Sequence, residues 1–398
     1  MSTANLLSSR ETWKDILFAD DFYLSQRTEA EKSRLLATWY KDFMTSDFDL
    51  PQIDADSVVF FRSLVRDDYR TFFELVRDNV DFPCVTVQDY KKRRSDGRLN
   101  LAASKFLISN KKLFDLVDAR NGFEQSLLYI RSCMYKYILD HFRSQPKPKA
   151  VVFFADMQPI EHLLARHFRA MGVPTVTLQH GLYVDYGDYH TVNKINYLHQ
   201  PSEYFLSWGP ETSELIARHH PTTRIVECGK PLIFNASPPP GAKPAQPYVS
   251  LFLDQKPFQA QNIEMIETVL AYAQPRGLEV KVRFHPSLPK AEILLRYPGM
   301  AEQLHFTDAA LIVGHTSSLL YEALALGCRV MRFATEIPAI PLPDNSQFST
   351  LQELEQKLTL PQEKDLWRRY FTALGEDALK NYRAFFDELL NNRKVMTA

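Results

Sequence analysis

The sequence predicts an α/β protein of two domains, each a parallel sheet covered by helices, which face each other across a cleft and follow a helical N-terminal extension. Three observations predict this class. From about residue 150 onward, short apolar runs rich in β-branched and aromatic residues alternate with helical patterns, which is typical of βα units. A proline-rich segment at 235–247 interrupts the alternation, which then starts again. The chain of 398 residues is long enough for two cores.

The N-terminal part is predicted to be helical. Residues up to about 80 are rich in charged and aromatic side chains and poor in glycine and proline. Apolar residues recur at helical spacing in 29–44, 58–80 and 115–145, so each of these ranges is predicted to be an amphipathic helix. The extension therefore covers about 1–148 and ends at the prolines that precede residue 150.

The first sheet completes an N-terminal domain at 1–240. Apolar runs bounded by proline, glycine and aspartate predict its strands, and helical patterns lie between them. The predicted strands are 150–156, 173–181, 203–209 and 222–231, with helices at 160–172 and 210–220.

The linker between the domains is "NASPPPGAKPAQP", 235–247. Five of its residues are proline, which extends the chain and excludes a helix or a central strand. The C-terminal domain, 248–398, repeats the βα pattern, and its last helix could pack back onto the N-terminal domain. Its predicted strands are 248–254, 278–286, 310–318 and 329–333, with helices at 260–277, 289–299, 319–327 and 363–392. The carboxyl ends of such strands face the cleft, where ligands bind.

Composition narrows the function classes. The chain has 47 Lys and Arg against 48 Asp and Glu, which argues against broad nucleic-acid binding. One basic run, "YKKRRSDGR" at 90–98, is either a solvated loop or a contact with anionic lipid or an anionic acceptor. The four cysteines are scattered without metal-ligand spacing, the N-terminus lacks a secretory pattern, and no apolar run approaches the roughly 18 residues of a membrane span. We expect a cytoplasmic protein, soluble or peripheral at the inner face of the cytoplasmic membrane.

The stretch "AALIVGHTSSLLYEALALG", 309–327, indicates a phosphate site. A strand is predicted to end at Gly314, and a polar loop with Thr316, Ser317 and Ser318 leads into a helix. The first turn of a helix presents unpaired N–H groups and a partial positive charge, which favour phosphate, and the serine hydroxyls add donors. Glu322 lies about one turn deeper, where a carboxylate can accept from a ribose diol. The alternative is a plain helix cap with a buried glutamate.

A second element agrees with a nucleotide site. His285 is predicted to end a strand in "KVRFHPS", and Pro286 fixes the backbone behind it. An imidazole at that place can donate to a phosphate oxygen, and in its protonated form it would stabilise a leaving phosphate.

These motifs carry a resemblance to a known group of enzymes. His285-Pro286, followed one βα unit later by Ser317-Ser318 and Glu322, resembles the nucleotide-binding half of bacterial GT-B glycosyltransferases of surface-polysaccharide assembly. Among these are capsule polysialyltransferases, Kdo transferases and CDP-glycerol glycerophosphotransferases, which use cytidine-nucleotide donors. The resemblance covers mainly residues 150–335. It implies two Rossmann-like domains, with His285 and the two serines on donor phosphate and Glu322 on ribose.

Three residues of the N-terminal domain are candidates for a catalytic base beside the acceptor. His180 precedes Gly181 at a predicted strand end and resembles the proposed base of the glycerophosphotransferases; the alternative is a histidine that caps a turn. Asp156 follows another strand, and Glu161 lies early in the next helix. Either carboxylate could deprotonate an acceptor hydroxyl, and Asp156 could equally cap a helix.

Further candidates flank the cleft. Asp254 and Gln255 follow the first strand of the C-terminal domain and resemble a motif of retaining β-Kdo transferases, in which the aspartate attacks the anomeric carbon; the alternative is turn chemistry. Lys230 and Arg283 lie at strand ends and suit a sugar carboxylate or a phosphate. No Asp-x-Asp pair stands where Mg²⁺ is obviously needed, so we expect no metal and no cofactor besides the CMP-sugar donor substrate.

The leading interpretation is a glycosyltransferase that moves an acidic sugar from a CMP-sugar to a growing capsule or lipopolysaccharide O-antigen glycan. Kdo ranks first, because the resemblance at Asp254-Gln255 favours it and the acidic-acidic-glycine motif of polysialyltransferases is missing. The alternatives are CDP-glycerol glycerophosphotransfer, sialyl transfer, UDP-sugar 2-epimerisation, and a catalytically inactive nucleotide-sugar sensor or scaffold. The expected partners are a nucleotide sugar, an oligosaccharide or glycolipid acceptor, and a peripheral membrane or assembly-complex contact; no nucleic acid is expected.

Overall fold

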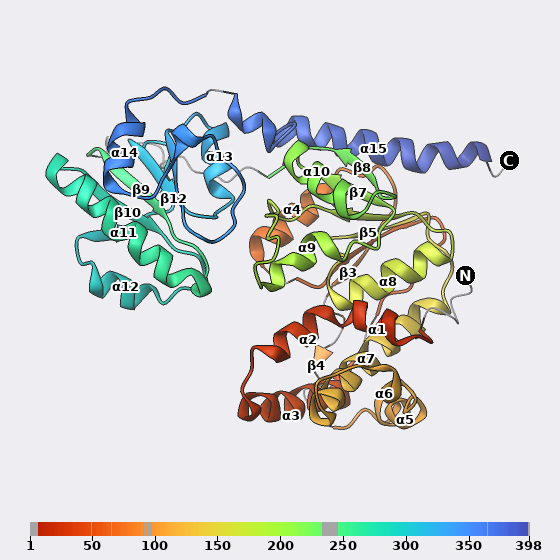
Figure 1. Ribbon diagram of the computed structural model, residues 1–398. Coiled ribbons are helices and arrows are strands. Elements are labelled where there is room, and N and C mark those ends of the chain that lie inside the picture. Colours follow the sequence, from red (N-terminus) through yellow and green to blue (C-terminus); the bar gives the residue numbers. More distant parts are fainter. Residues whose placement is uncertain are drawn as a thin grey trace.

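The computed structural model describes residues 7–48, 50–64, 66–88, 90, 92–93, 98–232, 246–363 and 365–396. Two α/β domains lie side by side (Figure 1), and each contains a six-stranded sheet. The predicted fold class is confirmed. The basic run at 90–98 and the proline-rich linker fall mostly outside the described residues.

The N-terminal sheet has the order β3-β2-β5-β6-β7-β8 and is parallel throughout. Its inner strands are buried on both faces, as expected for a parallel sheet covered by helices. The strands are β2 (Val58–Arg62), β3 (Cys84–Gln88), β5 (Ala150–Phe153), β6 (Thr175–Leu178), β7 (Tyr204–Ser207) and β8 (Arg224–Glu227). A separate two-stranded pair joins β1 (Ser46–Asp47) and β4 (Lys92–Arg93).

The prediction of one helix over 58–80 is wrong. Its first part is the central strand β2, and only α4 (Asp67–Arg77) is helical. All five residues of β2 are buried, so the strand reads as a continuous apolar run that periodicity alone cannot separate from a buried helix. The helical extension is therefore interrupted by two strands of the N-terminal sheet, β2 and β3.

Helices cover both faces of this sheet. The predicted helices at 29–44 and 115–145 correspond to α3 (Glu29–Thr45) and α7 (Gly122–Arg143). Phe61 of β2 points toward α7 and lies 5.3 Å from the ring of Phe142, whereas Phe60 points to the opposite face. The remaining helices of this domain are α1 (Arg10–Ile16), α2 (Phe18–Ser25), α5 (Leu101–Ser109), α6 (Leu113–Leu116), α8 (Pro159–Ala170), α9 (Ile195–Leu198) and α10 (Pro210–His219).

The C-terminal sheet has the order β11-β10-β9-β12-β13-β14 and is also parallel. All four predicted strands are present, and two short edge strands, β11 and β14, were not predicted. The strands are β9 (Tyr248–Phe252), β10 (Glu279–Arg283), β11 (Met300–Glu302), β12 (Leu311–Gly314), β13 (Val330–Phe333) and β14 (Gln347–Phe348). The helices are α11 (Gln259–Ala273), α12 (Lys290–Arg296), α13 (Leu319–Ala325) and α14 (Leu351–Leu358).

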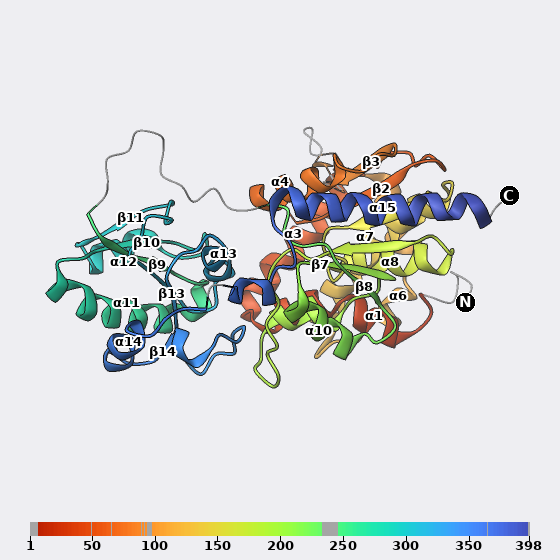
Figure 2. The same cartoon turned by 90° about the horizontal axis from the view of Figure 1, so that it is seen from above.

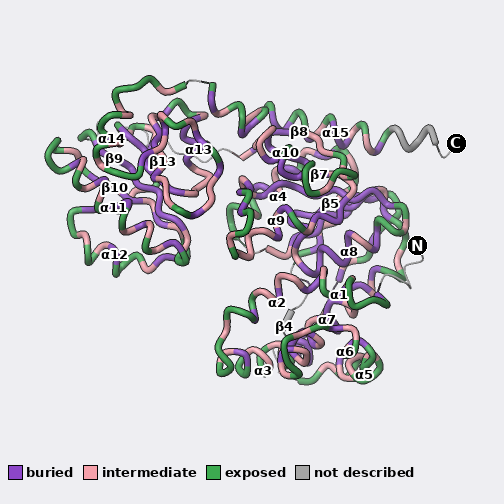
Figure 3. The backbone as a smooth tube through the Cα atoms, in the orientation of Figure 1, coloured by how far each residue is buried: buried purple, intermediate pink, exposed green. Residues whose placement is uncertain are grey.

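The last helix, α15 (Gly375–Met396), returns to the N-terminal domain and runs along its sheet (Figure 2). The ring of Phe386 lies 6.2 Å from that of Phe60 of β2. The ring of Phe385 lies 5.5 Å from that of Tyr204 of β7. The helix therefore supplies part of the N-terminal core, and the buried backbone in Figure 3 follows the strands of both domains.

The chain's return from the C-terminal domain is bound to the end of the N-terminal sheet. The Lys230 amide donates to the Ala373 carbonyl at 2.9 Å, and the Gly375 amide donates to the Lys230 carbonyl at 3.0 Å. A Cβ atom at Gly229 would lie 2.4 Å from the Ala373 carbonyl oxygen, and this glycine also has φ +89°. Both features require glycine, so the backbone segments approach closely where the domains meet.

Among the described residues, no helix is long and apolar enough to span a bilayer.

Candidate functional site

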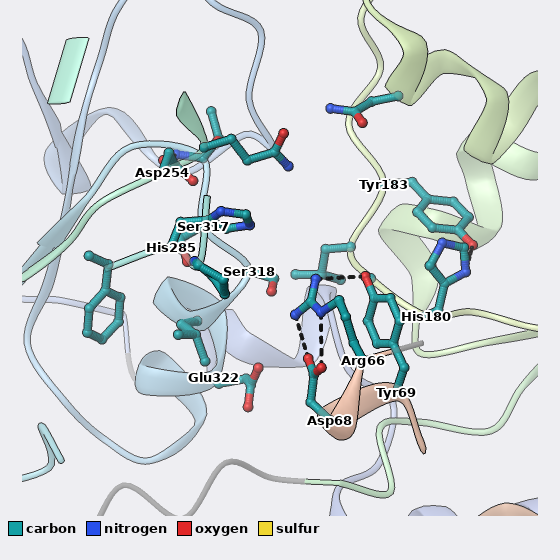
Figure 4. A pocket seen from close by; sticks show the side chains of 18 of the residues that line it. Arg66, Asp68, Tyr69, His180, Tyr183, Asp254, His285, Ser317, Ser318 and Glu322 are labelled. Carbon is teal, nitrogen blue, oxygen red and sulfur yellow. Dashed lines mark hydrogen bonds and ion pairs between the residues drawn. The ribbon is translucent and has the colours of Figure 1, made fainter. Parts of the chain in front are cut away.

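A cleft of about 870 Å³ lies between the two domains and is lined by residues of both. Its C-terminal wall comes from the loops after β9, β10 and β12, which are the carboxyl ends of adjacent parallel strands. Its N-terminal wall comes from the loops after β2, β5, β6, β7 and β8. The sequence-predicted residues in its lining are Lys230, His180, Asp254, Gln255, Arg283, His285, Pro286, Thr316, Ser317, Ser318 and Glu322. Figure 4 shows several of them facing one another.

The polar loop before α13 is held from two sides. Gly314 ends β12, and a Cβ atom there would come within 3.1 Å of the Leu320 side chain, so the glycine lets the helix fold back tightly on the strand. The Thr316 amide donates to Asp254 Oδ2 at 2.7 Å. Ser318 is the N-cap residue of α13, and its hydroxyl makes no capping bond to the helix. The loop therefore presents the Ser317 and Ser318 side chains to the cleft.

Asp254 is fixed at the end of β9. Its backbone amide donates to Asn262 Oδ1 at 2.9 Å, and Asn262 Nδ2 donates to the Asp254 carbonyl at 3.0 Å. Burial raises the pKa of the Asp254 carboxyl to about 6, against the opposing hydrogen bond from Thr316. The carboxylate thus connects β9 to the serine loop, which is a contact that the sequence did not predict.

His285 has a defined tautomer. The Ser287 amide donates to its Nδ1 at 3.2 Å, so in the neutral ring Nε2 carries the proton. Burial lowers the pKa of His285, and the charge of Arg66 lowers it further while Asp68 opposes the shift. At pH 7 the His285 imidazole is therefore neutral and has one N–H donor, rather than the protonated form considered from the sequence. A bound phosphate would favour protonation.

Lys230 and Glu322 form an ion pair across the two domains. Their side chains are 11% and 3% exposed, so water screens the pair poorly. The Lys230 ammonium also lies 4.8 Å from the ring centroid of Trp208, at a distance typical of a cation–π contact. The predicted ribose acceptor therefore already has a cationic partner, which a bound ribose would have to displace or share.

His180 lies on the opposite wall. Its Nδ1 is 3.1 Å from the hydroxyl of Tyr183, and its ring packs edge-on against Tyr69. Burial lowers the pKa of His180 to about 4, although a hydrogen bond with the Leu178 backbone opposes the shift. The imidazole is neutral at pH 7 and can accept a proton, and an anionic substrate beside it would raise its pKa.

No family model matches the sequence, and no curated protein matches it. The fold is similar to that of UDP-GlcNAc 2-epimerase from Methanocaldococcus jannaschii, solved with UDP-GlcNAc and UDP: identity is 12%, coverage is 83% of this chain and 99% of that chain, and the TM-score is 0.54. The fold is also similar to that of UDP-GlcNAc 2-epimerase from Neisseria meningitidis, solved with UDP-GlcNAc. The sequence identity is 13%, the match covers 84% of this chain and 100% of that chain, and the TM-score is 0.50. For the wall teichoic acid polymerase TagF the sequence identity is 12%, the match covers 96% of this chain and 98% of that chain, and the TM-score is lower, 0.45.

The fold is GT-B-like. At these identities the likeness concerns the two Rossmann-like domains and their arrangement, and it assigns no substrate.

Within this GT-B-like cleft, sequence reasoning missed a cluster after β2. Arg66 binds Asp68 through two hydrogen bonds, Nε to Oδ1 at 3.0 Å and Nη2 to Oδ2 at 2.6 Å. Its Nη1 donates to the Tyr69 hydroxyl at 3.1 Å. The helical pattern predicted over 58–80 hides the cluster, because it places Arg66 inside a helix. The signal that could have found it is the β-branched and aromatic run at 58–61, which predicts a strand end just before Arg66.

Asp156 and Glu161 are not among the residues that line the cleft. Glu161 is fully buried, and its carboxylate accepts from the Ser63 amide at 2.5 Å and from the Ala155 amide at 2.9 Å. Asp156 is also fully buried and accepts from the Ser202 amide at 3.0 Å. Burial raises the pKa of Glu161 to about 8 and that of Asp156 to about 6. Both carboxylates hold loops in place behind the cleft.

Proposed function

We propose that the protein is a glycosyltransferase that uses a nucleotide-activated donor, with a CMP-activated acidic sugar, Kdo in first place, as the donor. The observation that carries the proposal is the shared cleft. His285, Ser317, Ser318 and Glu322 line one wall, and His180 lines the other. A cleft between two Rossmann-like domains is where such folds bind ligands.

Each donor-side residue has a role that its contacts support. The Nε2–H of His285 and the hydroxyls of Ser317 and Ser318 are donors for phosphate oxygens. Glu322 accepts from the ribose hydroxyls, and the displaced Lys230 ammonium then becomes available to a phosphate or to the carboxylate of an acidic sugar. Arg283 lines the same wall and suits the same anionic groups. The donor's negative charge is thereby met by the chain's own groups.

Acceptor activation is assigned to the N-terminal wall. His180 takes the proton from the acceptor hydroxyl as that oxygen attacks the anomeric carbon, and the nucleotide leaves with the bonding electron pair. The acceptor is a saccharide or glycolipid, reached from the cytoplasm or from the inner face of the cytoplasmic membrane. Asp156 and Glu161 do not line the cleft, so His180 is the base in this route.

Asp254 offers a different route. As a nucleophile it would form a covalent glycosyl adduct and release the nucleotide, and the acceptor would then displace it with retention of configuration. Its carboxylate lines the cleft, and Oδ2 is held by Thr316. A mass increase of one donor sugar on the peptide containing Asp254 would support this route.

One experiment tests the proposal directly. The purified chain is incubated with CMP-, CDP- and UDP-activated donors, with and without saccharide acceptors, and the released nucleotide is identified. We expect CMP release that increases with a suitable acceptor. Release of UDP or UMP alone would overturn the cytidine assignment. A change in the donor sugar without an acceptor would instead identify an epimerase.

CDP-glycerol glycerophosphotransfer is the second candidate function. The observation that favours it is the position of His180 and Gly181 in the cleft lining, because this pair resembles the glycerophosphotransferase motif. The same donor panel separates the two, since CDP-glycerol would release CMP and leave glycerophosphate on the acceptor.

A further inference from the structure

The outward face of α5 carries large apolar side chains in solvent. Leu101 is 70% exposed and Ile108 is 75% exposed. Leu99, just before the helix, is 57% exposed. Leu101 and Ile108 are seven positions apart, with Lys105 between them, so the three share one side of the helix. We call 98–112 the α5 surface.

The α5 surface is strongly basic although the chain is not. Residues 98–112 contain four cations, Arg98, Lys105, Lys111 and Lys112, and no acidic residue, whereas the whole chain has a formal net charge of −1. All four are exposed. Among the residues that the structure describes, no carboxylate forms an ion pair with any of the three lysines. The next acidic residue along the chain is the exposed Asp115.

The other side of α5 is anchored to the fold. Asn100 caps the helix by accepting from the Ala102 and Ala103 amides, Ala103 is fully buried, and the ring of Phe106 lies 5.1 Å from that of Tyr137 on α7. The exposed leucine and isoleucine are therefore not needed to hold the helix. Figure 1 shows α5 and α6 at the end of the N-terminal domain away from α15, and none of the residues 98–112 lines the donor cleft.

We propose that the α5 surface docks on an anionic lipid bilayer. Aliphatic side chains reach the boundary of the acyl chains while flanking lysines contact lipid phosphates, which is how interfacial helices bind. Charge complementarity selects this occupant: a second copy of the chain would bring two identical sets of four cations together, which is repulsive. A soluble anionic glycan would meet the lysines but would gain little from Leu101 and Ile108.

The test uses the full chain and vesicle flotation. Vesicles of phosphatidylcholine are prepared with and without phosphatidylglycerol. We expect binding to the anionic vesicles, weakened by salt, and little binding to pure phosphatidylcholine. Each cation near such a surface contributes roughly fivefold to partitioning, so Lys111→Gln with Lys112→Gln should reduce it about 25-fold. Leu101→Ser with Ile108→Ser should also reduce it.

The matched control is Leu295→Ser. Leu295 is 84% exposed on α12 of the C-terminal domain, so its replacement removes an equally exposed leucine elsewhere and should leave flotation unchanged. Thermal unfolding checks that each variant remains folded.

The proposal is overturned if the wild-type chain does not float with anionic vesicles, if Leu295→Ser weakens flotation as much as the α5 variants do, or if the α5 apolar variants bind normally while only the charge variants fail. Sedimentation showing a dimer that the α5 apolar variants dissociate, without vesicle binding, would assign the surface to a second copy. Nucleotide release is measured separately, so failure here leaves the proposed donor chemistry unaffected.

Discussion

Replacing Asp254 by asparagine tests whether a buried carboxylate serves the reaction or the fold. Asp254 is 6% exposed, and its pKa is raised from 3.8 to about 6 because burial disfavours the charged form. Raising the pKa from 3.8 to about 6 corresponds to about 3 kcal/mol between the two protonation states. Above pH 6 the Asp254 carboxylate is ionised in the folded protein, and its burial then lowers the free energy of unfolding by about 3 kcal/mol.

The direction of the pH dependence follows from the raised pKa. The folded state binds the Asp254 proton more tightly than the unfolded state does, so this proton stabilises the fold. Its contribution to the free energy of unfolding is fully present below pH 3.8, the pKa of an unfolded aspartate, and is lost as the pH rises through about 6. Asparagine resembles the neutral carboxyl, and its amide oxygen can still accept from the Thr316 amide. We therefore expect Asp254→Asn to be at least as stable as the wild type at pH 8 and to lose this part of the pH dependence.

The assay combines denaturant unfolding at pH 4 and pH 8 with CMP binding and sugar transfer. If the carboxylate acts on the substrate, the variant is stable at pH 8, binds CMP and loses nearly all transfer. Loss of more than about 2 kcal/mol of stability at pH 8 would refute the reasoning, because it would make the ionised carboxylate a structural group. Stable protein with normal transfer would refute the assignment to the reaction. Asn262→Ala is the matched control for position, since Asn262 holds only the backbone of Asp254.

Three further predictions concern the surrounding residues. Glu161→Gln should lower stability by about 1–3 kcal/mol at pH 5, where the carboxyl is protonated: each of its two oxygens can still accept a backbone N–H, whereas the amide NH₂ of glutamine places a donor against one of them; equal denaturation midpoints would contradict this. Lys230→Met should lower stability by about 3 kcal/mol, since it removes the ammonium group that pairs with the buried Glu322 carboxylate, and adding Glu322→Gln should restore part of the loss in thermal unfolding. Replacing Ser317 and Ser318 together by alanine should weaken CMP binding at least about tenfold in calorimetry, because hydrogen bonds to a charged group are lost; unchanged affinity would leave the loop with a structural role only.

The βα part of the fold was predictable because its strands are buried on both faces. Such strands form short apolar runs with clear helical patterns between them. The strand β2 could not be recognised in this way. Its apolar residues are followed closely by those of α4, and the segment between them, 63–66, contains neither glycine nor proline to mark the end of the strand. The edge strands β11 and β14 were not predicted because they have only three and two residues, which is too short to show the alternation of a strand.

The site was predictable where polar residues follow a strand directly. His285 follows β10 and the serine loop follows β12, and these two strands flank β9, so the carboxyl ends of the parallel strands bring both to one wall. The pairing of Lys230 with Glu322 joins residues 92 positions apart in different domains, and no local pattern contains it. Glu161 lies outside the cleft lining, and the sequence could not show this, because a carboxyl group early in a helix gives the same pattern whether it faces a cleft or accepts from two buried backbone amides.

The return of α15 to the N-terminal sheet has a consequence for synthesis on the ribosome. The C-terminal sheet is complete once Phe348 has left the exit tunnel, so that domain can fold while the chain is still growing. The N-terminal sheet is made earlier but lacks Tyr382 and Phe386, which cover Phe60 and Phe72 in the same core. Although made first, this domain therefore finishes folding last, and a nascent chain that stalls before α15 exposes an aromatic surface to chaperones.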